Sequence, residues 1–147
     1  MEDFDTQNRY TFDRLELHEL DLLQDEECYY KAIKELKPDY VIHTACPFFT
    51  EVAPGDEKQK QDVKERIKRY RNSSRLLAKS ACMNGVKKVI MTGAATSVIG
   101  PKPKQIGSYK DSFPWADQSQ MTRPNELAKL VAERAVWDEI LRQQAAD

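Results

Sequence analysis

The stretch VKKVIMTGAATSVIG, residues Val86–Gly100, decides the fold. Val89, Ile90 and Met91 form a short apolar run, and small residues follow it directly. A short apolar run that ends in small residues is typical of a buried parallel strand with a functional loop at its carboxyl end. Open α/β sheets place their ligand crevice at the carboxyl ends of the strands. We therefore expect the corner Thr92–Ser97 to line any site.

The composition favours a single domain without a strongly charged partner. The chain has 147 residues, 40% of them hydrophobic, and 23 basic residues balance 24 acidic ones for a net charge of −1. We expect no nucleic-acid partner, no membrane span and no signal peptide. The three cysteines have no metal or redox spacing, which predicts reduced thiols and a cytoplasmic location. The two histidines and scattered acids predict no metal site, and His43 is expected to be a satisfied core residue.

The first part of the chain alternates between candidate strands and a helix. Residues 1–14 are polar and are expected to form a loose lead-in. Near-alternation of leucines over Leu15–Leu20 predicts a short strand. A helix should begin with Asp25 as its N-cap and end at Lys37, before a proline. The apolar segment Tyr40–Ala45 predicts a second strand, which Cys46-Pro47 ends.

A long helix and a final helix complete the pattern. The long helix is expected over Asp56–Met83, followed by the Val89–Met91 strand and a loop at Pro101–Met121, and the last helix starts at Pro124. The first half of the long helix is rich in Lys and Arg, which indicates a solvated face or a nucleic-acid patch. The solvated face is favoured because no aromatic platform accompanies it. One face of the long helix is expected to be buried through Val63, Ile67, Tyr70, Leu77 and Ala81.

This order of elements predicts an α/β fold. Strands that alternate with helices form parallel sheets with right-handed crossovers. We expect a partial doubly wound sheet of the Rossmann type over residues 15–147, with three αβα layers.

Several segments in chain order are similar to motifs of one family: Leu20-Asp21-Leu22, Val41–Pro47 (VIHTACP), Gly85–Thr92 (GVKKVIMT), Tyr109-Lys110-Asp111 with Trp115, and Arg123–Glu133 (RPNELAKLVAE) with Trp137. Together they resemble the extended short-chain dehydrogenase/reductases of the NAD-dependent epimerase/dehydratase superfamily. The branch most similar contains dihydroflavonol reductases and 3β-hydroxysteroid dehydrogenase-like proteins. The resemblance implies an NAD(P)-dependent oxidoreductase that acts on CH–OH groups of a small-molecule substrate. It also implies that the cofactor is contacted by Asp21, Leu22, Thr44, Ala45, Pro47 and Lys129.

The catalytic positions depart from the family pattern. The family uses Ser, Tyr and Lys, and Lys129 matches its Lys. The Tyr position is Asn125, one helical turn earlier, and the Ser position is Ala94. An amide does not titrate near neutral pH and alanine offers no hydrogen-bond donor, which predicts impaired catalysis. A nearby hydroxyl is an alternative for the Ser: Thr92, Thr96 or Ser97.

The glycine pattern also departs from the family. The five glycines make no G-x-x-G-x-x-G turn, so the resemblance begins near the family's third strand and lacks the first βαβ unit. The predicted Leu15–Leu20 strand then has no family neighbour. It could pair with the Tyr40–Ala45 strand, pair with another chain, or belong to a piece that does not fold alone. An exposed sheet edge favours a protein partner or self-association. Two functions stay open: an NAD(P)-dependent reductase, or a non-catalytic scaffold, interaction subunit or fragment.

Overall fold

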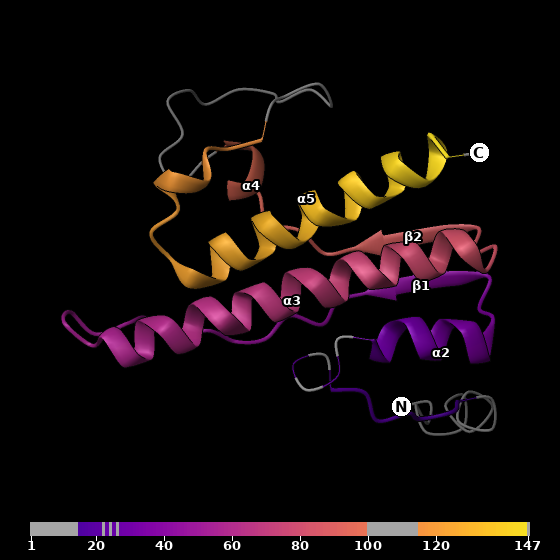
Figure 1. Ribbon diagram of the computed structural model, residues 1–147, viewed down its shortest axis with the longest axis horizontal. Helices are drawn as coiled ribbons and strands as arrows, with labels where there is room; N and C mark the ends of the chain where they lie inside the picture. Colours follow the sequence, from indigo (N-terminus) through magenta and orange to yellow (C-terminus); the bar gives the residue numbers. More distant parts are fainter. Residues whose placement is uncertain (1–14, 22, 24, 26, 100–114, 147) are drawn as a thin grey trace, which may run out of the picture.

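The computed structural model describes residues 15–21, 23, 25, 27–99 and 115–146, and the predicted lead-in 1–14 lies outside them. Helices and strands alternate through most of this part of the chain (Figure 1). The elements are, in order, α2 (Cys28–Leu36), β1 (Tyr40–His43), α3 (Glu57–Met83), β2 (Lys88–Met91), α4 (Thr96–Ile99), the 3-10 turn η1 (Gln118–Gln120) and α5 (Pro124–Gln144).

The sheet of the described residues is a parallel pair of strands. β1 pairs with β2 in the register Tyr40 to Lys88 through His43 to Met91. Backbone hydrogen bonds extend the ladder at both ends, from Lys87 N to Asp39 O at 2.8 Å and from Thr92 N to His43 O at 3.0 Å. Parallel pairing requires a crossover between the strands, and α3 provides it. The predicted α/β class is therefore confirmed.

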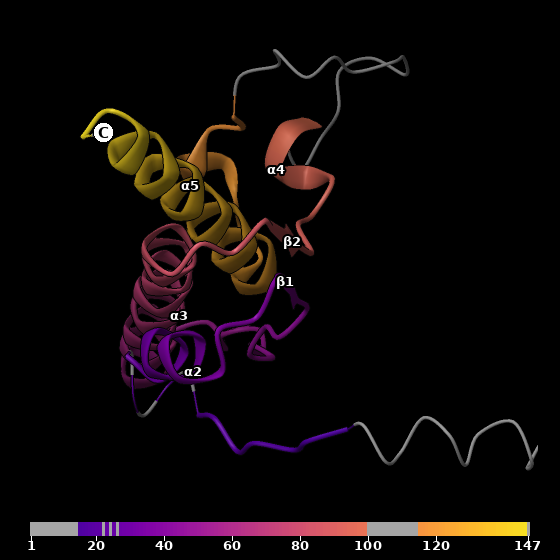
Figure 2. The same cartoon turned by 90° about the vertical axis from the view of Figure 1, so that its right-hand side faces the viewer.

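The helices α2, α3 and α5 lie on one side of this sheet, as Figure 2 shows. On the other face, the side chains of Tyr40, Ile42 and Ile90 are 64%, 69% and 50% exposed. Successive strand residues point to opposite faces, so these exposed side chains mark a face that the described helices do not cover. The described residues thus form two layers, and the expectation of three αβα layers is wrong for them.

Most of the core lies where α3 meets α5 and α2. The five α3 residues predicted to face inward are all buried. Phe49, from the loop after β1, joins Val63, Ile67 and Tyr70 of α3 and two alanines of α5 in one apolar cluster. Ala128 and Ala132 are completely buried, so their small side chains allow α5 to lie close against α3. The long helix is therefore the element on which the other helices pack.

Local signals explain the ends of the long helices. The side chain of Asp56 accepts a hydrogen bond from Gln59 N at 2.8 Å, which caps the start of α3. Gly85 follows α3 with a φ of 70°, a left-handed conformation that glycine adopts without strain. Pro124 occupies the first turn of α5, where its lack of an N–H costs nothing.

The predicted Leu15–Leu20 strand is wrong. These residues adopt no regular structure, and Leu17 is 87% exposed. They therefore do not pair with β1. A strand needs a neighbouring strand with which to share backbone hydrogen bonds, and the described sheet places none beside this segment.

Other boundaries differ by one to three residues. α2 begins at Cys28, because Asp25 forms a turn in which its Oδ1 accepts from Glu27 N at 2.9 Å. β1 ends at His43, before Ala45.

The cysteines differ in their exposure to solvent: Cys82 is exposed, whereas Cys28 is buried. Of the predicted loop at 101–121, residues 101–114 lie outside the described part.

Candidate functional site

The carboxyl ends of the two strands meet at one corner, as the sequence predicts. The hydrogen bond from Thr92 N to His43 O brings Thr44-Ala45 beside Thr92-Gly93. Thr44, Ala45 and Thr92 are exposed there. We call residues 44–45 and 92–97 the strand-end corner. It is the place where an open α/β sheet binds its ligand.

One face of α5 meets this corner. Asn125, Lys129 and Glu133 follow one another at steps of four residues, which places them on the same side of the helix. The side-chain nitrogen of Lys129 lies 3.5 Å from Gly93 O, at the limit of a hydrogen bond. The structure thus brings the predicted Lys129 to the strand-end corner, together with Thr92 and Ala94.

Asn125, which the resemblance aligns with the family's Tyr, forms two hydrogen bonds with the backbone of the loop after β1. Its Oδ1 accepts a hydrogen bond from Phe49 N at 2.9 Å, and its Nδ2 donates one to Phe49 O at 2.8 Å. The Phe49 side chain is 1% exposed. Asn125 therefore fixes that loop to the start of α5, a role that local sequence patterns do not reveal. A tyrosine at this position could not form the same pair of bonds.

Glu133 is a titratable group at the corner that the sequence analysis did not single out. A Cβ atom added to Gly93 would lie 2.7 Å from Glu133 Oε2, so the carboxylate rests against the Gly93 backbone. Burial raises the pKa of the Glu133 carboxyl, and the neighbouring Ser97 hydroxyl lowers it by less. Its place four residues after Lys129 is the signal that could have identified it.

The hydroxyls proposed in place of the family's Ser have different environments. Thr92 is exposed, Thr96 is half-buried and Ser97 is buried. Thr96 Oγ1 and Ser97 Oγ have no hydrogen-bond partner in the described part of the chain. Ser97 is the one whose hydroxyl lies next to the Glu133 carboxyl. Ala94 is half-buried and offers only a methyl group.

The cofactor contacts implied by resemblance are not all brought together. Thr44 and Ala45 lie at the strand-end corner, and Pro47 is half-buried in the loop that follows. Asp21 instead forms a turn in which its Oδ1 accepts from Leu23 N at 2.8 Å, and it lines a groove of about 350 Å³ against α2. Leu22 lies outside the described residues.

The model of the NAD dependent epimerase/dehydratase family matches residues 3–143. The chain belongs to this family. The match confirms the superfamily that the sequence motifs indicated, and it implies a Rossmann-like α/β fold and an NAD(P)-dependent, oxidoreductase-like function at the level of the family. No curated protein and no solved structure matches the chain.

The corner of this epimerase/dehydratase family member does not fit the diphosphate of a nicotinamide cofactor. Backbone N–H groups of a glycine-rich turn hold such a diphosphate, and the spacing of the glycines in these 147 residues does not match the G-x-x-G-x-x-G motif of that turn. The glycine at the corner, Gly93, has the Glu133 carboxylate against it, which would repel a phosphate. The ammonium group of Lys129 is a hydrogen-bond donor, which suits the contact with a ribose hydroxyl that the resemblance implies.

The described residues contain no group of three or more His, Cys, Asp or Glu side chains that could hold a metal ion. None of the described helices is both long and apolar enough to cross a membrane.

Proposed function

We propose that this chain is a non-catalytic member of the NAD dependent epimerase/dehydratase family that serves as an interaction scaffold. The observation that carries the proposal is the pair of hydrogen bonds between Asn125 and the Phe49 backbone. The position that supplies the proton in the family is taken by an amide, which does not titrate, and both of its polar atoms have a structural partner.

The surface of the sheet supports the interaction role. Tyr40, Ile42 and Ile90 form an apolar face that the described residues leave exposed. Contiguous exposed apolar side chains are typical of contact surfaces between proteins. Each strand of the parallel pair also has one free edge within the described sheet, which can accept a further strand.

A turnover assay tests the proposal. The purified chain is mixed with NADPH and a panel of aldehydes and ketones, and loss of the reduced nicotinamide absorbance is followed. We expect no carbonyl-dependent oxidation. Carbonyl-dependent oxidation that Lys129→Met abolishes, and that the exposed α3 control Lys58→Met retains, would show that the site is catalytic and overturn the proposal.

A second candidate function is an NAD(P)-dependent reductase of the dihydroflavonol reductase and 3β-hydroxysteroid dehydrogenase-like branch. The position of Lys129 next to Gly93 O favours it, because the Lys of the family is retained at the strand-end corner. The Glu133 carboxyl, with its raised pKa, would be the titratable group available in place of Tyr.

Cofactor binding separates the two candidates. A ligand that binds only the folded chain raises its melting temperature, so millimolar NADPH should raise it for a reductase and leave it unchanged for a scaffold. Glu133→Gln would abolish turnover in the reductase. Under the scaffold proposal the same variant has no turnover to lose.

A further inference from the structure

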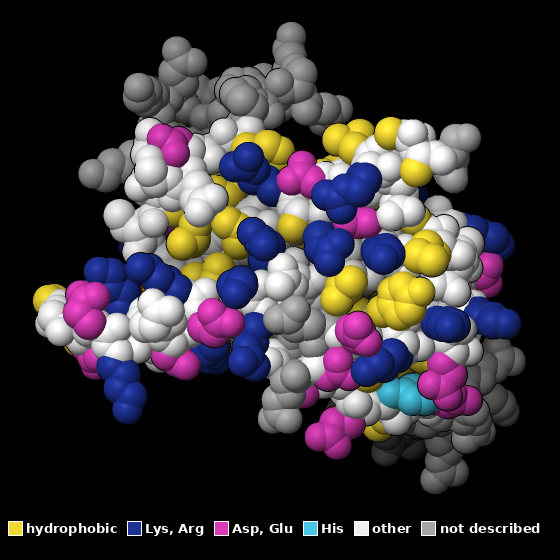
Figure 3. Space-filling view, viewed as in Figure 1, with side chains coloured by type: hydrophobic (Ala, Val, Ile, Leu, Met, Phe, Trp, Pro, Cys, Tyr) yellow, Lys and Arg dark blue, Asp and Glu magenta, His cyan; other side chains and the backbone are white. Residues whose placement is uncertain are grey.

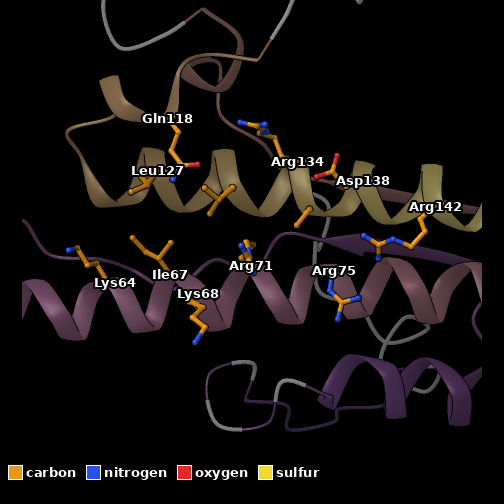
Figure 4. Close-up of a pocket in the computed structure, with 12 residues that line it drawn as sticks. Lys64, Ile67, Lys68, Arg71, Arg75, Gln118, Leu127, Arg134, Asp138 and Arg142 are labelled. Carbon is orange, nitrogen blue, oxygen red and sulfur yellow. The ribbon is translucent and has the colours of Figure 1, made fainter.

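A groove of about 660 Å³ runs between α3 and α5, on the side of these helices away from the sheet (Figure 4). Basic side chains surround it, and Figure 3 shows Lys and Arg gathered along this face with apolar atoms between them. We call it the α3–α5 groove. Its basic residues are Lys64, Lys68, Arg71, Arg75, Arg134 and Arg142.

The basic residues of α3 form a single line along the groove. Lys64, Lys68, Arg71 and Arg75 recur at steps of four, three and four, which keeps them on one face of the helix. At 1.5 Å per residue this line is about 16 Å long. Part of the basic face that the sequence predicts for the long helix therefore forms one wall of the groove. The positive charges are spread along the groove and are not gathered at one point.

Acidic residues neutralise only part of this charge. The Glu139 carboxylate, whose side chain is 2% exposed, accepts hydrogen bonds from Arg75 and Arg142 and so holds both guanidinium groups in place. Asp138 is the acidic residue of the lining. Within the described residues, Lys64, Arg71 and Arg134 form no ion pair with a carboxylate. The chain as a whole carries a net charge of −1, so this positive charge is local.

The middle of the groove is apolar. Ile67 of α3 and Leu127, Val131 and Ala135 of α5 supply aliphatic side chains between the basic ones. Among its described lining residues there is no aromatic side chain on which a nucleic-acid base could stack. An aliphatic floor between basic walls matches a helix with an apolar stripe and acidic flanks.

We propose that the α3–α5 groove binds an acidic amphipathic helix of a partner protein. The proposal names the partner class of the interaction scaffold and rests on that role. Apolar residues of the partner helix at steps of three and four cover Ile67, Leu127 and Val131. Its acidic residues lie opposite Lys64, Arg71 and Arg134, whose charges have no acidic partner in the described part of the chain. Such charge complementarity gives specificity and speeds association.

The probe is a fluorescent peptide of about 14 residues, with leucines at helical spacing and glutamates on either side, long enough to cover the line of α3 cations. Fluorescence anisotropy measures its binding to the full chain. A peptide of the same composition with the leucine spacing scrambled is the control for simple charge attraction. We expect the patterned peptide to bind at least about tenfold more tightly, to gain helix content on binding, and to weaken as salt is added.

Two sets of variants locate the binding on the chain. Arg71→Glu with Arg134→Glu should weaken peptide binding by at least about tenfold. The matched control is Lys34→Glu with Lys58→Glu, which makes the same charge change at exposed positions outside the groove lining and should leave the affinity within about twofold. Circular dichroism melts check folding. If the Glu pair unfolds the chain, Arg71→Gln with Arg134→Gln provides the same comparison.

Four results would overturn the proposal. The scrambled peptide could bind as tightly as the patterned one, or neither peptide could bind at about 100 μM protein, well above the micromolar range of ordinary recognition. A single-stranded RNA could displace the peptide and lose its own binding in the Arg71→Glu, Arg134→Glu variant, which would assign the groove to nucleic acid. The wild-type chain could sediment as a dimer that this variant dissociates, which would assign it to a second copy. None of these results depends on NADPH turnover, so failure here is distinct from failure of the non-catalytic proposal.

Discussion

The side-chain amide of Asn125 pairs with both backbone polar groups of Phe49, across 76 residues of chain. This contact joins the first turn of α5 to the loop that leaves β1, and it places the buried Phe49 ring in the cluster between α3 and α5. Asn125 thus links two parts of the chain that are far apart in the sequence.

Removing this amide should lower the free energy of unfolding. Asn125→Ala leaves the N–H and C=O of Phe49 without their partner, and unpaired buried backbone groups cost about 1–3 kcal/mol. Chemical denaturation of the variant measures the loss. Gln144→Ala, at an exposed position near the end of α5, is the control and should change stability by less than about 0.5 kcal/mol. Equal effects of the two substitutions would contradict a structural role for Asn125.

The buried His43 should make stability depend on pH. Burial lowers the pKa of its imidazole, Nε2 has no hydrogen-bond partner in the described structure, and the ring packs against Tyr29 and Tyr70. The expectation that His43 lies in the core is confirmed. The expectation that its ring nitrogens are satisfied by hydrogen bonds is wrong for Nε2.

The folded chain binds a proton at His43 less tightly than the unfolded chain, in which a histidine has a pKa of about 6.5. The free energy of unfolding is therefore highest above that pH and falls as the pH drops toward the lowered pKa, by at most about 1.4 kcal/mol per pH unit. His43→Phe should remove this slope between about pH 7 and pH 5. His18→Gln, at an exposed position, should retain it. An unchanged slope in His43→Phe would assign the dependence to another group.

Gly93 and Glu133 should be energetically coupled. Gly93→Ala places a Cβ atom 2.7 Å from Glu133 Oε2, so the carboxylate must move away. A side chain forced off its rotamer costs about 0.5–1.5 kcal/mol. In a double-mutant cycle measured by denaturation, Glu133→Ala should remove most of the cost of Gly93→Ala. Additivity within about 0.3 kcal/mol would mean that the two groups do not meet.

Local patterns predicted the long elements well. α3 and α5 begin within one residue of their predicted starts, because Asp56 caps the first and Pro124 opens the second. The two strands were also found, since β1 and β2 are apolar segments bounded by turn residues, but the expectation that they are buried is wrong: in β1 only His43 is buried, and in β2 no residue is. Leu15–Leu20 instead shows near-alternation of leucines but has no neighbouring strand in the described residues, and alternation alone does not make a strand.

The candidate site was predicted only in part. Lys129 was identified by resemblance to the family, and the strand-end corner follows from the rule for open sheets. The bonds between Asn125 and Phe49 could not be predicted in this way, because a side-chain amide that pairs with distant backbone leaves no periodic signal. Glu133 lies four residues after Lys129, a spacing that could have identified it, but its contact with Gly93 depends on how closely α5 approaches the corner.

Because α3 lies between α2 and α5, its position determines which parts of the chain unfold together. This helix spans 27 residues and contacts both α2 and α5, while its ends connect the two strands. Amides in its middle can exchange with solvent deuterium only when the helices on both sides separate, so they should be the slowest to exchange. The two neighbouring helices then do not unfold as independent units, and a ligand that tightens one of them slows exchange in the other.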